Sequence, residues 1–306
     1  MSEVTVTRPL TIPDGTRQRL RTFYGSPVLD WLDTVAATID RTAYGWGVTI
    51  DGYHDRGWTS VIAHGFTNDN EPVIIKAVPD PARYHRELAT LRHWDSAAAE
   101  VLASDDATRT FLLPMVGHSP GGATPPHDHE LRTALRLPSL HRRPATRQRH
   151  VPDLQTLFNQ RIQPQINASQ QLKQCLGSNA VAAITRLGQL ALDRDRTRTM
   201  LHGDLYFENV VFNTGGHPTF VDPRGITGPA AYDWAFWCVF YLDDGLERRL
   251  AMIDRLGLVD RAAVIPWIVV ITADSLRHHL QAGDHPGAQH LQAILAMPAV
   301  REAIGG

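Results

Sequence analysis

Asp204, Asn209 and Asp222 have the residue types and the spacing of a phosphoryl-transfer site. Asp204 and Asn209 lie within Leu201-His-Gly-Asp-Leu-Tyr-Phe-Glu-Asn209, and Asp222 follows in Phe220-Val-Asp222. The Asp204 carboxylate could orient a substrate hydroxyl and accept its proton. The oxygens of Asn209 and Asp222 suit the magnesium ion that bridges nucleotide phosphates. An aspartate in a loop usually forms only a turn, but the three residues in this order predict transfer of a phosphoryl group.

A short hairpin would bring the two proposed magnesium ligands together. Val210-Val-Phe212 and Thr219-Phe-Val221 have the composition of strands, and the turn sequence Asn213-Thr-Gly-Gly216 separates them. Asn209 and Asp222 then lie at the two ends of the hairpin and meet despite the sequence gap.

The N-terminal third of the chain offers candidate phosphate-binding groups. Lys76 lies in the predicted strand Val73-Ile-Ile-Lys-Ala-Val78, and Glu87 lies in a predicted helix over residues 82 to 95. An ion pair between Lys76 and Glu87 would hold the ammonium group toward the nucleotide phosphates. The alternatives are a lysine on an exposed strand face and a glutamate on a solvated helix. No glycine-rich phosphate loop lies between the first two predicted strands, but backbone amides there, together with Thr59 or Ser60, could still contact phosphate.

Changes in sequence pattern predict three regions. Residues 1–113 are expected to form an N-terminal lobe, with a helical extension and a sheet that binds nucleotide. Residues 114–126, which are rich in Gly and Pro, are expected to form a hinge and linker. Residues 127–306 are expected to form a helical C-terminal lobe with the catalytic loop and the acceptor site. The first lobe has a predicted helix through Val28, Val35 and Ile39 and further predicted strands, at Val48–Ile50, Ser60–Ala63, Glu100–Leu102 and Thr110–Leu113, with a turn over Ser104-Asp-Asp106.

The composition is that of an ordinary globular protein. Of 306 residues, 43% are hydrophobic and 20% are charged, and the formal net charge of -2 gives no sign of a general nucleic-acid binder. The two cysteines, Cys175 and Cys238, are expected to be buried thiols and not a disulfide. No secretory signal and no apolar stretch long enough to span a bilayer is recognisable, which predicts a cytoplasmic protein without a membrane partner.

The motifs resemble those of the aminoglycoside phosphotransferases within the protein-kinase-like superfamily, nearest the streptomycin 6-kinase and hydroxyurea phosphotransferase family. The likeness is carried by His202–Asn209, by Phe220-Val-Asp-Pro-Arg-Gly225 and by Gly228-Pro-Ala-Ala-Tyr-Asp233, and it covers most of residues 10 to 245. It implies an α+β, bilobal kinase-like fold with a small antiparallel-sheet N-lobe and a larger helical C-lobe, and ATP bound between them.

The resemblance also implies roles for single residues. Asp204 is the catalytic base, Asn209 and Asp222 hold Mg2+, and Lys76 contacts phosphate. Asp233 is expected to brace the backbone of the loop. His202 is expected to hydrogen-bond the backbone there, not to act as an acid or base.

The adenine would meet the backbone of the segment Leu113-Pro-Met-Val-Gly117. Pro114 stands in this segment where relatives commonly have an acidic residue. Because proline has no N–H group, recognition of the base must use neighbours such as Leu113 and Met115, or a guanine is accepted and GTP replaces ATP.

The catalytic loop departs from the family pattern in the two aromatic residues Tyr206 and Phe207. Relatives often have histidines there, so these aromatics would shape a different acceptor pocket. The absence of a lysine two residues after Asp204 argues against a protein kinase.

An acidic cluster, Asp243, Asp244 and Glu247, could contact a cationic acceptor. A solvated start of a helix is the alternative. The nearby Trp234, Trp237 and Tyr241 recur at helical spacing and are expected in the core.

The leading prediction is an ATP-dependent O-phosphotransferase acting on a small hydroxylated molecule, most simply an aminoglycoside of the streptomycin type. A kinase for another hydroxylated metabolite, such as an amino sugar or a nucleoside antibiotic, is the second reading. A nucleotide-binding pseudokinase is a third, which the intact Asp204, Asn209, Asp222 and Lys76 oppose. The sequence leaves open which hydroxyl is phosphorylated, the oligomeric state, and whether the role is resistance, self-protection or metabolism.

Overall fold

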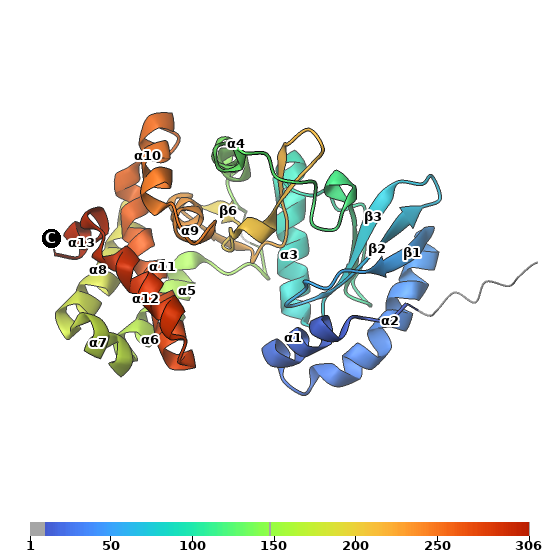
Figure 1. Cartoon of the computed structure of the whole chain (residues 1–306), viewed down its shortest axis with the longest axis horizontal. Helices are drawn as coiled ribbons and strands as arrows, with labels where there is room; N and C mark the ends of the chain where they lie inside the picture. The colour runs from blue at the N-terminus through green and yellow to red at the C-terminus, as the bar shows by residue number, and fades with distance from the viewer. Residues whose placement is uncertain (1–9, 147, 306) are drawn as a thin grey trace, which may run out of the picture. The chain divides into compact units, whose positions relative to one another are not determined.

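A five-stranded antiparallel sheet and a set of helices make up the two parts of this chain (Figure 1). The structure is a computed structural model that describes residues 10–146 and 148–305. One unit runs to Pro126 and takes in Val211–Thr219, and the other comprises His127–Val210 and the chain from Phe220 onward. The predicted α+β fold, with a small antiparallel sheet followed by a larger helical part, is confirmed.

The sheet of the first unit has the strand order β1-β2-β3-β5-β4, and every neighbouring pair is antiparallel. Its strands are β1 (Val48–Tyr53), β2 (Val61–Thr67), β3 (Pro72–Ala77), β4 (Ala103–Asp105) and β5 (Thr110–Pro114). The register places Lys76 opposite Phe111 on β5 and Ile62 on β2. Lys76 is therefore in the middle of the sheet, where a strand face is covered.

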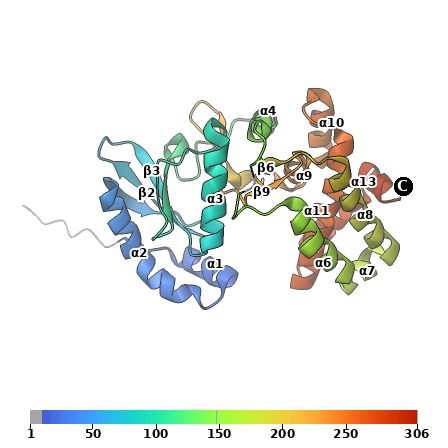
Figure 2. The ribbon, with the colours of Figure 1, turned by 180° about the vertical axis from the view of Figure 1, so that it is seen from behind.

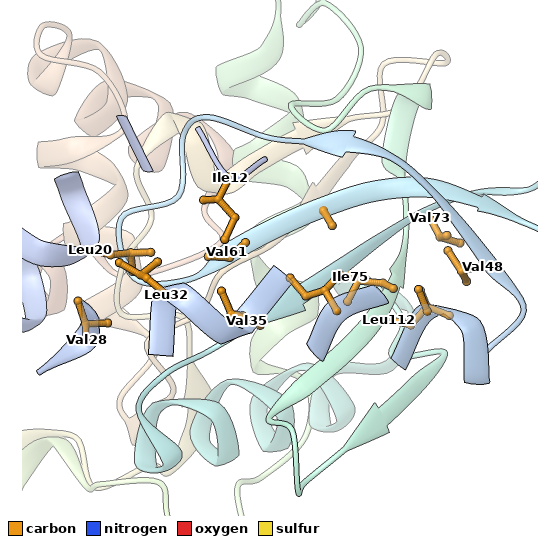
Figure 3. Packing of buried hydrophobic residues seen from close by; sticks show 14 residues of the cluster. Ile12, Leu20, Val28, Leu32, Val35, Val48, Val61, Val73, Ile75 and Leu112 are labelled. Atoms are coloured by element: carbon orange, nitrogen blue, oxygen red, sulfur yellow. The ribbon is translucent and has the colours of Figure 1, made fainter. Parts of the chain in front are cut away.

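Two helices cover one face of this sheet. They are α1 (Asp14–Tyr24) and α2 (Val28–Gly45), and α2 confirms the predicted helix. Apolar side chains recur every three or four residues along α2 and are buried against Val73 and Ile75 of β3 (Figure 3). Because side chains alternate along a strand, Lys76 points to the opposite face. There it meets α3 (Pro81–Trp94), the predicted helix after β3.

Two expectations for this region and for the cysteines are corrected. The strand predicted at Glu100–Leu102 is instead β4 at Ala103–Asp105, because the Asp105 carboxylate accepts a hydrogen bond from the Ala107 N–H and starts the turn there. Cys238 is a buried free thiol as predicted, but Cys175 is only half-buried.

The second unit is mostly helical (Figure 2). Its α-helices are α4 (His129–Arg136), α5 (Leu154–Leu157), α6 (Gln163–Ala168), α7 (Gln170–Leu176), α8 (Ser178–Arg194), α9 (Ala231–Phe240), α10 (Leu246–Leu256), α11 (Arg261–Ala282), α12 (His285–Ala296) and α13 (Pro298–Gly305). The central helix is α11, which packs against α8, α9 and α12. Within the described residues, no helix combines the length and the apolarity needed to cross a bilayer.

Short strands position the candidate active loop. β6 (Thr199–Leu201) leads into the loop and pairs with β9 (Ile226–Gly228). β7 (Val210–Phe212) leaves it and pairs with β8 (Pro218–Phe220). The predicted hairpin is therefore confirmed, with its second strand one residue earlier than expected.

Candidate active site

The loop between β6 and β7 turns sharply before Asp204. Gly203 has a φ of 71°, in the left-handed region that favours glycine, and a Cβ placed there would lie 3.2 Å from the side chain of Ile226. Leu205 is fully buried and anchors the loop, whereas the Asp204 side chain on one side of it keeps 23% exposure. The local backbone thus presents the candidate base at the surface of a fixed loop.

A buried carboxylate, that of Asp233, holds this backbone. The N–H groups of His202 and Gly203 donate to its two oxygens, each at 2.8 Å. Asp233 lies in the first turn of α9 and has no exposed surface. Hydrogen bonds to a charged acceptor are stronger than neutral ones, so the loop start is tied to a helix of the core. The predicted bracing role of Asp233 is confirmed.

His141 adds a further contact to the brace. Its Nε2 atom lies 2.9 Å from Asp233 Oδ2, and its side chain is 7% exposed. Sequence reasoning missed His141, which lies 92 residues before Asp233 among scattered histidines. No local pattern marks it, because the contact depends on where the short helix Leu137–His141 packs.

His202 links the loop to the segment that carries Asp222. Its Nε2 atom donates to the carbonyl oxygen of Val221 at 2.9 Å, and the Arg224 N–H donates to the His202 carbonyl at 2.9 Å. Complete burial lowers the pKa of His202, which keeps the ring neutral at neutral pH. The backbone role predicted for His202 is confirmed.

Asn209 and Asp222 are brought to adjacent positions. The Val221 N–H donates to the Asn209 carbonyl at 3.0 Å, which places Asp222 one residue from the contact. The side-chain amide nitrogen of Asn209 donates to the Asp204 carbonyl at 2.7 Å. With that nitrogen engaged, the amide oxygen is the atom available to a cation. This oxygen and the Asp222 carboxylate are hard ligands that fit Mg2+.

The backbone at Asp222 is also unusual. Its φ is 58°, a left-handed conformation that costs a non-glycine residue on the order of 1–3 kcal/mol. The hydrogen bonds of Val221 on one side and Arg224 on the other hold it there. Strain that the surroundings maintain at a polar residue is typical of a functional position.

Arg224 adds a positive charge beside the candidate base. Its Nη1 atom lies 3.9 Å from Asp204 Oδ1, and the side chain is 49% exposed. The sequence identified Arg224 only as part of a motif, and the structure adds its contact with Asp204.

In the first unit, the predicted ion pair between Lys76 and Glu87 is present. Lys76 Nζ lies 2.5 Å from Glu87 Oε1, and the two side chains are 5% and 1% exposed. The readings of an exposed lysine and a solvated glutamate are therefore wrong. Burying two charges costs solvation free energy, so this pair is a candidate for function and not for stability alone.

The other residues proposed to meet the nucleotide are buried in the first unit. Ser60, Leu113 and Met115 are 1%, 7% and 8% exposed. The Met115 N–H donates to the Pro72 carbonyl at 2.9 Å and so extends the pairing of β3 with β5 past Pro114. The Met115 N–H is thus already engaged and cannot replace the donor that Pro114 lacks.

The residues proposed to contact the acceptor separate into two groups. Tyr206 follows Asp204 in the loop, and Asp243 and Asp244 are exposed a few residues beyond the end of α9. Glu247 instead lines a hollow formed by α10, Arg261 and the residues from Met297 to Val300, and no catalytic-loop residue borders that hollow. The predicted core positions Trp234, Trp237 and Tyr241 are confirmed, at 2% exposure or less.

The sequence of this chain matches the model of a known protein family. The family described as "Aminoglycoside/hydroxyurea antibiotic resistance kinase" has a sequence model that matches residues 45–283, which is most of the chain. No curated protein sequence matches the chain significantly.

Solved structures share the fold at low sequence identity. A choline/ethanolamine kinase family protein from Mesorhizobium loti is 14% identical with a TM-score of 0.63, over 89% of this chain and 97% of that one. The aminoglycoside phosphotransferase APH(4)-Ia, solved as a thermostable mutant with ADP and hygromycin B, is 14% identical with a TM-score of 0.60, over 88% and 98%. The choline kinase LicA from Streptococcus pneumoniae is 10% identical with a TM-score of 0.59, over 88% and 98%. At these identities, the likeness establishes the fold.

The brace on the catalytic loop can be tested through His141. Because His141→Ala removes a partner from the buried Asp233, we expect a loss of about 1–3 kcal/mol in the free energy of unfolding. We also expect a lower kcat, since the loop backbone loosens. Urea denaturation and steady-state kinetics measure the two effects. Arg142→Ala, at the exposed neighbouring position, is the control, and equal effects of the two substitutions would contradict the role of His141.

The ion pair can be tested with a double-mutant cycle. Lys76→Met leaves the Glu87 carboxylate buried without its ammonium partner, so we expect it to cost about 3–5 kcal/mol of unfolding free energy. Adding Glu87→Gln should recover part of that loss, because the uncompensated charge is gone. Denaturant titrations of the four proteins measure the coupling. Additive effects of the two substitutions would show that the pair is not energetically linked.

Proposed function

The chain belongs to the aminoglycoside/hydroxyurea antibiotic resistance kinase family of phosphotransferases, and we propose that it transfers the γ-phosphate of ATP to a hydroxyl group of a small molecule. The leading acceptor is an aminoglycoside of the streptomycin type, and the activity is cytoplasmic. The observation that carries the proposal is the fixed loop that presents Asp204 beside Asn209 and Asp222, braced by Asp233.

In this reaction Asp204 orients the acceptor hydroxyl. The acceptor oxygen forms a bond to the γ-phosphorus, the bond from that phosphorus to the bridging oxygen of ADP breaks, and the hydroxyl proton passes to the Asp204 carboxylate. Asn209 and Asp222 would hold Mg2+, and the bound ion would neutralise charge on the phosphate oxygens. Arg224, 3.9 Å from Asp204, offers a second positive charge for the transferred phosphoryl group.

The nucleotide role falls to residues of the first unit. Lys76 would contact the phosphates with Glu87 fixing its direction, and Ser60 would approach them from the start of β2. The base would meet the segment from Leu113 to Gly117. The Met115 N–H already donates to the Pro72 carbonyl, so recognition of the nucleotide base would use backbone carbonyl oxygens and shape complementarity. GTP therefore stays an alternative to ATP as the phosphate donor.

A second acceptor class is favoured by one observation. Tyr206 and Phe207 bring aromatic rings to the loop. Phe207 has no ionisable group, and burial raises the pKa of Tyr206 to about 12, so neither side chain balances an acceptor cation at physiological pH as a carboxylate would. Another hydroxylated metabolite, such as an amino sugar or a nucleoside antibiotic, is therefore the alternative. Asp243 and Asp244 are the exposed carboxylates that would favour a cationic acceptor.

A phosphotransfer screen tests the proposal. The purified chain with Mg2+ and either ATP or GTP would be assayed against aminoglycosides, amino sugars and nucleoside antibiotics. We expect turnover of a hydroxylated member of this set, and a kcat at least about a thousandfold lower for Asp204→Ala, since it loses the group that orients and deprotonates the hydroxyl. Glu208→Ala, at an exposed position in the same loop, serves as the control.

The contrary results are distinct. Full transfer activity in Asp204→Ala would refute the role of Asp204. Turnover of another acceptor without turnover of streptomycin would overturn the streptomycin reading and keep the small-molecule kinase. Tight nucleotide binding without transfer to any acceptor would support the pseudokinase.

A further inference from the structure

Three aromatic rings pack against one another beside the candidate base. The Tyr206 ring lies 5.3 Å from the Phe236 ring and 5.5 Å from the Phe240 ring, and the last two are 4.8 Å apart. Phe236 and Phe240 are one helical turn apart on α9. We call Tyr206, Phe236 and Phe240 the aromatic shelf. It belongs entirely to the second unit, together with Asp204.

Of the three shelf residues, Tyr206 is the exposed one, and it differs in this from Phe207, the next residue in the loop. Tyr206 is 39% exposed and covers Phe236, which is 5% exposed. Phe207 instead packs edge-on against His129 and Tyr241. A hydrogen bond between the Tyr241 and Thr133 hydroxyls holds the Tyr241 ring in place. Phe207 therefore anchors the loop, whereas Tyr206 keeps part of its ring exposed among the residues that the structure describes.

The position of Tyr206 relative to the base is set by the backbone. Its N–H donates to the Asp204 carbonyl at 2.9 Å, and Leu205 between them is fully buried. Asp204 and Tyr206 therefore flank one inward-pointing residue and both retain exposed surface. A molecule whose hydroxyl reaches Asp204 can therefore also contact the exposed ring of Tyr206, two residues further along the loop.

The chemistry of Tyr206 suits an uncharged contact. Burial, and after it the charge of Asp204, raises the pKa of Tyr206 to about 12, so its hydroxyl stays neutral at physiological pH. The side chain thus offers an apolar ring and a neutral hydrogen-bonding group. Binding sites for small molecules are typically lined in this way, by aromatic surface with a few polar groups that fix orientation.

We propose that the aromatic shelf binds the acceptor and selects molecules whose reactive hydroxyl is carried by a ring with an apolar face, such as a sugar or a cyclitol. The C–H groups on one face of such a ring can bury against Tyr206 while a hydroxyl reaches Asp204. A small linear acceptor such as hydroxyurea has little apolar surface to bury and gains little from the shelf. This inference rests on the proposed phosphotransfer to a hydroxyl and names its acceptor class.

Steady-state kinetics on the full chain with ATP and Mg2+ test the proposal, with streptomycin and hygromycin B as cyclic acceptors and hydroxyurea as the linear one. Wild-type kcat/KM should be higher for a cyclic acceptor than for hydroxyurea. Tyr206→Ala should raise the KM for the cyclic acceptor on the order of tenfold, the loss of one aromatic contact, with the KM for ATP unchanged. Tyr206→Phe should recover most of the affinity because it restores the ring.

A matched control is Tyr44→Ala, which removes a tyrosine that is 89% exposed on α2 and should change neither KM. Tyr206→Leu provides a second test if Tyr206→Ala folds poorly, since leucine keeps an apolar side chain but loses the flat ring. A wild-type KM for the cyclic acceptor in Tyr206→Ala, or in Tyr206→Leu if the alanine variant does not fold, would overturn the proposal. A higher kcat/KM for hydroxyurea than for either cyclic acceptor would do so as well. Failure of the proposed function itself would look different, as no phosphate transfer by the wild type to any acceptor with either nucleotide.

Discussion

The buried carboxylate of Asp233 is the interaction on which the candidate site depends. It accepts hydrogen bonds from the backbone N–H groups of His202 and Gly203 at the start of the catalytic loop, and the His141 side chain contacts one of the same oxygens. A charge without solvent is costly unless it is paired and hydrogen-bonded. The same cost makes the geometry specific, because the loop can leave this conformation only by leaving the carboxylate unsatisfied.

The remaining parts of the site follow from that constraint. Once His202 is fixed, its ring reaches the Val221 carbonyl and its own carbonyl receives the Arg224 N–H. Val221 in turn pairs with Asn209, so the two proposed magnesium ligands are set by backbone contacts and not by each other. In the chain, Asp204 lies between His202 and Gly203, which Asp233 holds, and Asn209, whose side chain donates to the Asp204 carbonyl. A catalytic group held in this way needs little reorganisation when substrate binds.

The sequence predicted those features that depend on local pattern or on a recognisable motif. Lys76 stands among apolar residues in a predicted strand, and the predicted helix that carries Glu87 follows this strand directly, so their ion pair could be anticipated. Asp233 was identified through its motif. In each case, the residues that matter lie close to one another in the chain or in a family signature.

The features that were missed depend on contacts between distant segments. His141 meets Asp233 across 92 residues, and the Met115 N–H is engaged because the β3–β5 register continues past Pro114. The position of β4 was misjudged because the carboxylate of Asp105 decides where the turn begins. The outward face of Tyr206 likewise depends on its packing against α9, which loop sequence alone does not indicate.

Amide hydrogen exchange at His202 and Gly203 tests most directly the claim that Asp233 fixes the catalytic loop. In the wild type, both amides should exchange slowly, since each donates to a fully buried carboxylate. In Asp233→Asn, which keeps the side-chain shape but loses the charge and one acceptor oxygen, both should exchange much faster while the amides of β2 and β3 stay protected. Unchanged protection of His202 and Gly203 in that variant would contradict the account.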